Sequence, residues 1–274
     1  MSQISKRRDE TPTVFFKTLL RDAVAGAGAG GLTGVVVGFP EFLKVQKQSV
    51  DNSTLSSLLR DNSIRRNGAS FVPRFGLIFA GVCAIEFSIC DRTKRYCGTE
   101  AGIIAGALNG ALFLTAADHM MLYKQRLGLP ALQVARNLGP ALLTGFWPMF
   151  VRESGFLTSM HVLGPLFSRL LRSCSSLGPH SDKWYENAGV YCAQVPVTFV
   201  THPFDSLARE LQKERQRTGE AARLQAVFTS MLAEKHRFLN GVVPRLALAP
   251  VGLTLAVGLY RHFSSVMSLE EEKC

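Results

Sequence analysis

Arginine and glutamate stand side by side at positions 152 and 153, within a stretch of largely apolar residues. A guanidinium group binds a carboxylate through two parallel hydrogen bonds, and a neighbouring carboxylate can accept an ammonium group. Arg152 and Glu153 therefore have the chemistry to hold the two ends of one small zwitterion. The same side chains could instead bond to neighbouring helices, and the sequence leaves both interpretations open.

Three further carboxylates recur in a fixed setting. Each has a glycine 15 or 16 residues before it and a glutamine seven residues after it. The triplets are Gly26, Glu41 and Gln48; Gly102, Asp118 and Gln125; and Gly189, Asp205 and Gln212. The acids are 77 and 87 residues apart, and a period of this kind indicates a threefold internal repeat.

A proline follows each triplet and opens another apolar run. These prolines are Pro73, Pro148 and Pro244. Each repeat is therefore predicted to contain an apolar helix, a polar connection and a second apolar helix. The repeats are expected at about 18–97, 98–178 and 183–266 of a single membrane domain, residues 1–274.

The apolar runs are near or above the length that crosses a membrane. Hydrophobic residues make up 47% of the chain and charged residues only 19%, which is unusual for a soluble domain. The runs cover residues 23–40, 71–90, 101–123, 141–171, 188–207 and 241–260. A helix needs about 20 apolar residues to cross a bilayer core, and charges at that depth are expected to face a partner or a wet interior. We therefore expect helices that enclose something polar.

Glycines recur at every fourth position in two of these runs, and such side-chain-free faces let neighbouring backbones approach closely. The stripes consist of Gly26, Gly30 and Gly34 in one run and of Gly102, Gly106 and Gly110 in another. The third copy keeps only Gly189 and Ala193. We therefore expect its helix contact to be looser.

Other classes of function fit the sequence less well. The net charge of +10 would suit nucleic acid, but the basic residues are interleaved with glutamates and lack regularly placed aromatics. None of the six cysteines forms a C-x-x-C pair, so neither a disulfide framework nor a zinc site is expected. Residues 26–31 satisfy the dinucleotide pattern G-x-G-x-x-G, yet no alternation of strands and helices follows. We therefore expect neither an enzyme nor a cofactor.

In these features the chain resembles the mitochondrial carrier family. That family has three tandem repeats, odd-numbered helices that end in P-x-[DE]-x-x-[KR], and even-numbered helices that open with G-x-x-P. The third repeat matches best, with the sequence from His202 to Asp205. The resemblance implies an all-α fold of six transmembrane helices in three pseudo-symmetric repeats around a central cavity, with short surface helices on the matrix side. It also implies transport by alternating access across the mitochondrial inner membrane.

The resemblance assigns roles to the repeated triplets. Acids and nearby bases would close the matrix side as Glu41 with Lys44, Asp118 with Lys124, and Asp205 with Arg209. Glutamines Gln48, Gln125 and Gln212 would brace these pairs, and Pro40 and Pro203 would kink their helices. The sequence departs from the pattern, because only Lys44 stands three residues after its acid. At the opposite end, the family's aromatic-acid-x-x-base pattern survives only as the stretch from Asp91 to Lys94.

The family's substrate site lies about two turns into the even-numbered helices. Counted from the proline motifs, that level holds Gly76, Leu77, Ile78, Arg152, Glu153, Leu248 and Ala249. An Arg–acid pair there resembles carriers of amino acids and related zwitterions, and the apolar residues opposite suit an uncharged body. Glu86 is a further polar candidate without an assigned role. Alternatively, the lost gate residues fit a carrier-like membrane scaffold or adaptor that no longer transports.

Membrane lipids are the expected surroundings. Segments around 55–59, 132–135 and 224–232 have the apolar spacing of short amphipathic helices lying on a membrane surface. Basic residues in the connections suit anionic headgroups such as cardiolipin. Arg74 and Arg245 directly follow their prolines, so they could tie helix starts to headgroups or to an adjacent acid. We expect a multi-pass monomer with a small-molecule substrate and no nucleic-acid partner.

Overall fold

The computed structural model describes residues 12–49, 60–127, 131–174, 180–220, 223–234, 236–239 and 241–271. Every regular element in these ranges is helical, and none of them contains a strand. The predicted all-α fold class is therefore confirmed.

Long helices make up most of the described chain. They are α2 (Pro12–Ser49), α4 (Asn62–Cys97), α5 (Thr99–Leu127), α9 (Asp182–Thr218) and α12 (Val242–Glu271). A sixth long run consists of α7 (Phe146–Thr158), the π-helical turn η2 (Ser159–Leu163) and α8 (Gly164–Ser173). The short elements are α6 (Ala131–Leu138), the 3-10 turn η1 (Gly139–Leu143), α10 (Leu224–Ala233) and α11 (His236–Leu239).

Local sequence explains where several of these helices begin and end. The chain turns from α4 into α5 at Gly98 and enters α7 at Gly145, with φ of 96° and 91°, a region that residues with a Cβ rarely adopt. Ser181 caps the start of α9, where its hydroxyl accepts a hydrogen bond from the backbone N–H of Trp184. Gly219, with φ of 74°, ends the same helix.

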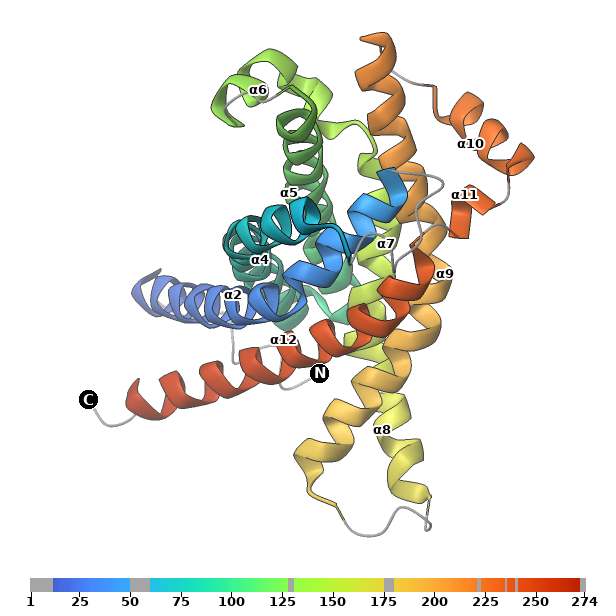
Figure 1. Cartoon of the computed structure of the whole chain (residues 1–274). Coiled ribbons are helices and arrows are strands. Elements are labelled where there is room, and N and C mark those ends of the chain that lie inside the picture. Colours follow the sequence, from blue (N-terminus) through green and yellow to red (C-terminus); the bar gives the residue numbers. More distant parts are fainter. Residues whose placement is uncertain are drawn as a thin grey trace.

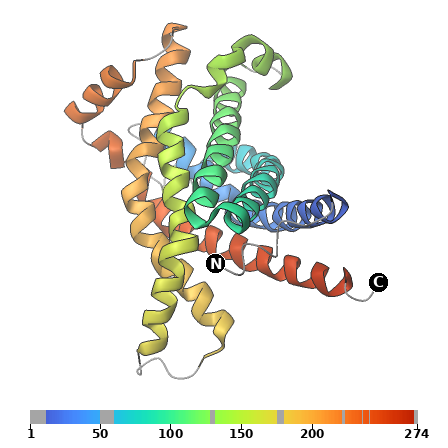
Figure 2. The same ribbon diagram turned by 180° about the vertical axis from the view of Figure 1, so that it is seen from behind.

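The long helices contact one another in a closed ring. α2 packs against α4, α4 against α5, α5 against α7, both α7 and α8 against α9, α9 against α12, and α12 against α2. Figure 1 shows α9 running side by side with the α7–α8 run, while α12 crosses them steeply. Figure 2 gives the same arrangement from behind. The helices therefore close on each other without forming a parallel bundle.

Four helices are long and apolar enough to cross a membrane. Within the described ranges they cover residues 13–39, 67–97, 99–120 and 245–268, and they identify the chain as a membrane protein by length and composition. The sequence predicted six spans. α9 falls short because uncharged polar side chains such as Gln194 and His202 lie within its apolar stretch, although both are buried inside the protein. The α7–α8 run is divided by its π-helical turn.

The glycine stripes bring helix backbones into close contact. A Cβ on Gly26 would lie 2.5 Å from the carbonyl oxygen of Cys83 in α4, and a Cβ on Gly30 would lie 2.5 Å from that of Phe79. On α9, a Cβ on Gly189 would lie 2.5 Å from the carbonyl oxygen of Gly164. The looser third contact predicted from the sequence is therefore wrong at this position, because a second glycine on α8 faces Gly189 and compensates for the shorter stripe.

Two of the predicted surface helices are present. α6 covers the segment around 132–135 and α10 covers 224–232, whereas the segment 55–59 lies outside the described residues. Met231 of α10 is fully buried against Leu207 and Leu211 of α9. Leu224, Phe228 and Leu232, spaced four residues apart on α10, remain exposed. α10 is therefore docked on α9 by one face and presents an apolar edge outward.

We predict that Gly26→Val destabilises the protein by about 1–3 kcal/mol, because the new side chain would collide with the α4 backbone. Gly81→Val on α4 is the matched control, since a Cβ there meets nothing within 4 Å. Thermal unfolding of both variants in detergent measures the difference. Equal losses in melting temperature would show that the close approach of α2 and α4 contributes nothing.

Candidate functional site

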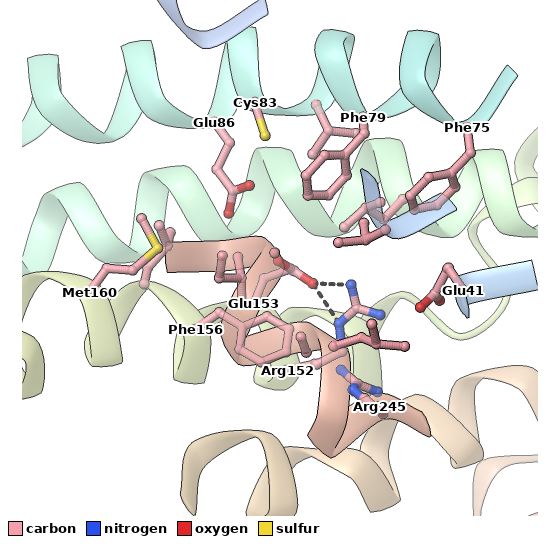
Figure 3. Close-up of a pocket in the computed structure, with 18 of the residues that line it drawn as sticks. Glu41, Phe75, Phe79, Cys83, Glu86, Arg152, Glu153, Phe156, Met160 and Arg245 are labelled. Atoms are coloured by element: carbon pink, nitrogen blue, oxygen red, sulfur yellow. Dashed lines mark hydrogen bonds and ion pairs between the residues drawn. The ribbon is translucent and has the colours of Figure 1, made fainter. Parts of the chain in front are cut away.

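A cavity of about 110 Å³ lies between α2, α4, α5, α7 and α12. Figure 3 shows charged and aromatic side chains pointing into it. The predicted substrate residues Arg152, Glu153, Leu248 and Ala249 all line this cavity. The gate acids Glu41 and Asp118 line it as well. The volume is below the roughly 300–1,000 Å³ of drug-sized ligand sites, so the cavity suits one small solute.

The prediction that Gly76, Leu77 and Ile78 of α4 line the cavity is wrong, because α4 turns a different face toward it. Leu77 is 77% exposed on the outer surface, and neither it, Gly76 nor Ile78 lines the cavity. Gly76 instead faces Val35 of α2, and Ile78 packs against a cluster around Val82. Counting residues from the proline motif gives the position of a residue along the helix axis. It does not give the side of the helix on which that residue lies.

The cavity face of α4 carries a different set of side chains. These are Phe75, Phe79, Val82, Cys83, Glu86 and Phe87. Their spacing of three, four and seven residues marks one face of a helix, and the stripe of phenylalanines is the signal in the sequence that could have found them. The rings of Phe75 and Phe79 stack at 5.7 Å between centroids. The α4 wall of the cavity is therefore mainly aromatic, with Glu86 as its charged member.

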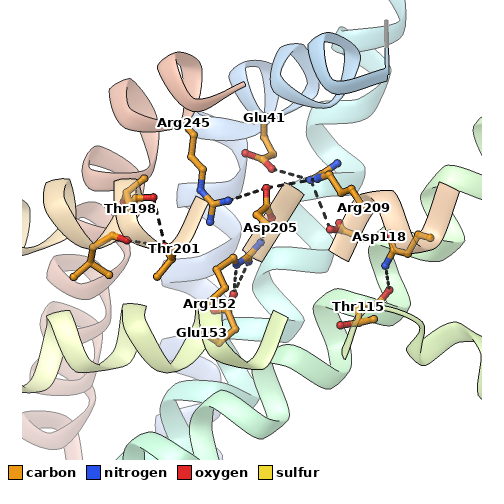
Figure 4. A network of polar contacts seen from close by, with 12 residues as sticks. Glu41, Thr115, Asp118, Arg152, Glu153, Thr198, Thr201, Asp205, Arg209 and Arg245 are labelled. Atoms are coloured by element: carbon orange, nitrogen blue, oxygen red, sulfur yellow. Dashed lines mark hydrogen bonds and ion pairs between the residues drawn. The ribbon is translucent and has the colours of Figure 1, made fainter. Parts of the chain in front are cut away.

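At one end of the cavity, the three predicted gate acids meet a single base. Arg209 of α9 lies 3.5 Å from Glu41 of α2, 3.6 Å from Asp118 of α5 and 3.6 Å from Asp205, one turn earlier on α9 (Figure 4). The Arg209 side chain is only 5% exposed. One guanidinium group therefore links three helices, each from a different predicted repeat.

Asp205 lies at the centre of this buried network. Its carboxylate is fully buried and approaches Arg152 of α7 at 2.6 Å and Arg245 of α12 at 2.7 Å, in addition to Arg209. Arg245 therefore ties the start of its helix to an acid, which is one of the two roles expected from the sequence. Arg152 also donates from Nε to Glu153 at 2.6 Å. The alternative interpretation of Arg152, a bond to a neighbouring helix, is thus what this conformation contains.

Burial sets the energetic character of the network. Taking a charge out of water costs several kcal/mol, and ion pairs repay that cost only with good geometry. The contact of Arg152 to Asp205 meets this condition, because it is a hydrogen bond at 2.6 Å. The approach of Arg245 at 2.7 Å is an ion pair without hydrogen-bond alignment, and the Arg209 contacts are longer. The network therefore specifies which helices meet, and removal of Asp205 leaves three buried guanidinium groups without their shared carboxylate.

The structure describes only some of the side chains predicted as gate bases, glutamine braces and helix-kinking prolines. The side chains of Lys44, Lys124, Gln48, Gln125 and Pro40 lie outside those that the structure describes. Gln212 is fully buried, but its Nε2 donates to the backbone carbonyls of Thr144 at 3.2 Å and Thr115 at 3.4 Å. It therefore ties α9 to α5 and to the start of α7 instead of bracing an ion pair. α9 continues as a helix through Pro203.

A second polar cluster lies near the other end of α4. Tyr260 of α12 donates to Asp91 at 2.8 Å, and His161 of η2 lies 3.4 Å from Lys94 and 3.3 Å from Cys90. The sequence showed no acid on α8 or α12 to pair with α4 here. Uncharged or weakly basic partners from the same places take up these contacts, and a charge pattern could not have found them.

We predict that Asp205→Asn lowers the free energy of unfolding by about 3–5 kcal/mol, because three buried guanidinium groups lose their shared carboxylate. Glu41→Gln is the matched change, and it should cost about 1 kcal/mol or less, since Glu41 is 27% exposed and lies 3.5 Å from Arg209, a longer contact than those of Asp205 to Arg152 and Arg245. Denaturant unfolding in detergent measures both. A larger loss in Glu41→Gln would refute the central place of Asp205.

No family model, no curated protein and no solved structure matches this chain. Its function therefore rests on the geometry of the cavity, the network beside it and the chemistry of the side chains that they share.

Proposed function

We propose that this chain transports a small zwitterionic, amino-acid-like metabolite across the mitochondrial inner membrane by alternating access, as a divergent member of the mitochondrial carrier family. One observation carries the proposal: carboxylates from α2, α5 and α9 converge on Arg209 at one end of a cavity lined with charged groups. Those three acids occupy equivalent places in three sequence repeats. Such convergence is what a closed gate of this family requires.

The arrangement of the helices supports the same proposal. The long helices contact each other in a closed ring, so six transmembrane helices in three pseudo-symmetric repeats around a central cavity are a natural assignment. α9 fits such an assignment because Val195, Phe199 and Val200 are exposed while its charges are buried. A helix with an apolar outer face and a charged inner face suits lipid outside and a wet interior. The repeats would span about 18–97, 98–178 and 183–266.

Alternating access needs two ends that open in turn. At the network end, ion pairs link α2, α5, α7, α9 and α12. At the other end, α4 is held to α12 by the hydrogen bond from Tyr260 to Asp91, to η2 by His161 beside Lys94, and to α2 by Arg95 at 3.8 Å from Asp22, so only one of these contacts is an ion pair. The network end is therefore the closed gate of this conformation, and the Asp91 end is the weaker barrier.

Arg152 couples substrate to gate in this proposal. It lines the cavity and at the same time pairs with Asp205. A substrate carboxylate that binds Arg152 competes with Asp205 for the same guanidinium group. Binding would thereby weaken the link between α7 and α9 and favour opening of the network end, which is the differential affinity that a conformational change requires.

The surface elements suit a membrane setting. The exposed apolar edge of α10, formed by Leu224, Phe228 and Leu232, would lie in the interface of the inner membrane. Arg223 precedes this helix and Arg237 follows it, so anionic headgroups such as cardiolipin are suitable lipid partners. We propose a multi-pass monomer in this membrane.

A carrier-like scaffold is the second candidate. It is favoured by the engagement of Arg152, Arg209 and Arg245 with protein carboxylates, which leaves each of these guanidinium groups already neutralised. A scaffold would use the same ion pairs as permanent links between helices. Transport of any zwitterion by the pure protein separates the two candidates.

We predict that Arg152→Gln lowers zwitterion uptake into reconstituted liposomes by about tenfold or more, because the substrate loses a bidentate partner worth about 1.5–3 kcal/mol. Uptake of the twenty standard amino acids is measured per folded protein, since Asp205 also loses a partner. Arg74→Gln, on the exposed side of α4, is the matched control and should leave uptake unchanged. No uptake of any amino acid by the unmodified protein would favour the scaffold.

We predict that Tyr260→Phe loosens the Asp91 end by about 1 kcal/mol, because it removes one hydrogen bond while the ring stays packed on Phe87 at 4.9 Å. Maleimide labelling of the buried Cys90 nearby, resolved by mass spectrometry, should become roughly fivefold faster. Tyr191→Phe, at a 42% exposed site on α9, is the matched control. If Tyr260→Phe leaves the labelling rate of Cys90 unchanged, the hydrogen bond from Tyr260 to Asp91 does not help to close this end.

A further inference from the structure

Glu86 is a buried carboxylate that the network does not use. It lies on α4, is only 6% exposed, and points into the cavity (Figure 3). Among the residues that the structure describes, it makes neither a hydrogen bond nor an ion pair. Buried carboxylates are normally paired with a positive group or hold a proton, so one that faces an open cavity without a described partner is a candidate binding position for a cation from outside the protein.

The position of Glu86 is prepared by a neighbouring helix. A Cβ on Gly110 of α5 would lie 2.8 Å from Oε1 of Glu86 and 2.9 Å from its Cδ. Any larger residue at position 110 would therefore displace the carboxylate. The other glycines of this stripe, Gly102 and Gly106, make way for the α4 backbone and for side chains of Cys90 and Leu157. Gly102 also lies against Cβ of Lys94, but Gly110 is the one of the three whose Cβ would meet a charged group itself.

The charges around the cavity are unbalanced in the same sense. The described carboxylates of the cavity and the network are Glu41, Glu86, Asp118, Glu153 and Asp205, and the described guanidinium groups are Arg152, Arg209 and Arg245. This set carries a formal excess of two negative charges. Glu153 is already bonded to Arg152 at 2.6 Å, so Glu86 is the carboxylate left to meet a positive group from outside the protein.

The surroundings of Glu86 suit an organic cation. Phe79 and Phe87 line the cavity from the same helix, and Phe156 lines it from α7. Aromatic faces attract ammonium groups through their quadrupoles, and they exclude the water that a small metal ion would keep. Figure 3 places Glu86 near Met160 at one end of the cavity and Arg245 at the other. Glu86 thus lies toward one end of the cavity, and the guanidinium groups of Arg152 and Arg245, with their carboxylate partners, lie toward the other.

We propose that Glu86, seated over Gly110, binds the ammonium group of the transported molecule, whose carboxylate faces Arg152 and Arg245. The inference rests on the proposed transport function and deepens it, because it makes a protonated amine a requirement of the substrate. It also moves the ammonium site from Glu153 to a residue on a different helix. Glu86 is therefore a specificity-determining residue.

The test separates the amine from the carboxylate with three related probes. L-norleucine carries both groups, pentylamine lacks the carboxylate, and hexanoate lacks the amine. Thermal shifts of the purified full chain report binding, because a ligand of the folded form raises the melting temperature. We expect stabilisation by norleucine and pentylamine, and none by hexanoate alone at the same concentration.

Two variants assign the effect to the site. Glu86→Gln should weaken pentylamine binding by about tenfold or more, because a charged hydrogen-bond acceptor is lost. Gly110→Ala should do the same by displacing the carboxylate. Glu100→Gln, at an exposed position on α5, and Gly81→Ala, where a Cβ meets nothing, are the controls and should bind as the parent does.

Each outcome decides one of the two proposals. Stabilisation by pentylamine that survives Glu86→Gln, or no stabilisation of the parent protein by pentylamine, overturns the role of Glu86. Stabilisation that depends on Glu86, in a protein that moves no norleucine or other amino acid into liposomes, supports the ammonium site and overturns transport. If Gly110→Ala lowers the melting temperature but leaves the pentylamine shift intact, Gly110 contributes only to helix packing, and its proposed role in positioning the Glu86 carboxylate is wrong.

Discussion

The pairing of Asp205 is the constraint on which the interior depends. A fully buried carboxylate is tolerated only with close positive partners, and here they come from α7, from the start of α12 and from the next turn of α9 itself. Arg209 then draws in the acids of α2 and α5. Since Asp205 cannot lose its partners without leaving a buried charge unpaired, and Arg209 reaches the acids of two more helices, five helices meet at one level of the molecule.

The outer surface follows the opposite rule. α9 buries Asp205, Arg209 and Gln212 on one face and exposes Val195 and Phe199 on the other, which reverses the pattern of a helix on a soluble protein. Because buried polar residues such as Gln194 and His202 interrupt the apolar run, average hydropathy misses α9 although its exposed face is apolar. Between helices, glycines allow the backbones to pack closely. Gly26, for example, lies so near the backbone of Cys83 that no side chain would fit.

The cavity and the network share residues, and this sharing gives the site a physical means of acting on the fold. Arg152 lines the cavity while it pairs with Asp205, so an occupant that engages Arg152 changes the balance of the contacts between α7 and α9. A residue that only lined the cavity could bind a solute, but this binding would not change the contacts between helices. Glu86 differs in this respect, because among the described residues it has no partner to release and contributes recognition alone.

The sequence by itself determined that the chain is helical and apolar, because these properties depend on periodicity and composition within each segment. The threefold repeat and the equivalence of the three acids stay predictions from residue spacing. Arg152, Glu153, Leu248 and Ala249 were placed correctly at the cavity by counting along their helices. Only the tertiary structure decided the rotation of α4, which turns Leu77 outward and Glu86 inward, and the choice of partners, such as Arg209 for three acids and Tyr260 for Asp91. The physical reason is that spacing specifies which residues share a face, whereas the direction of that face and the charges that meet it are set by packing between segments far apart in the chain.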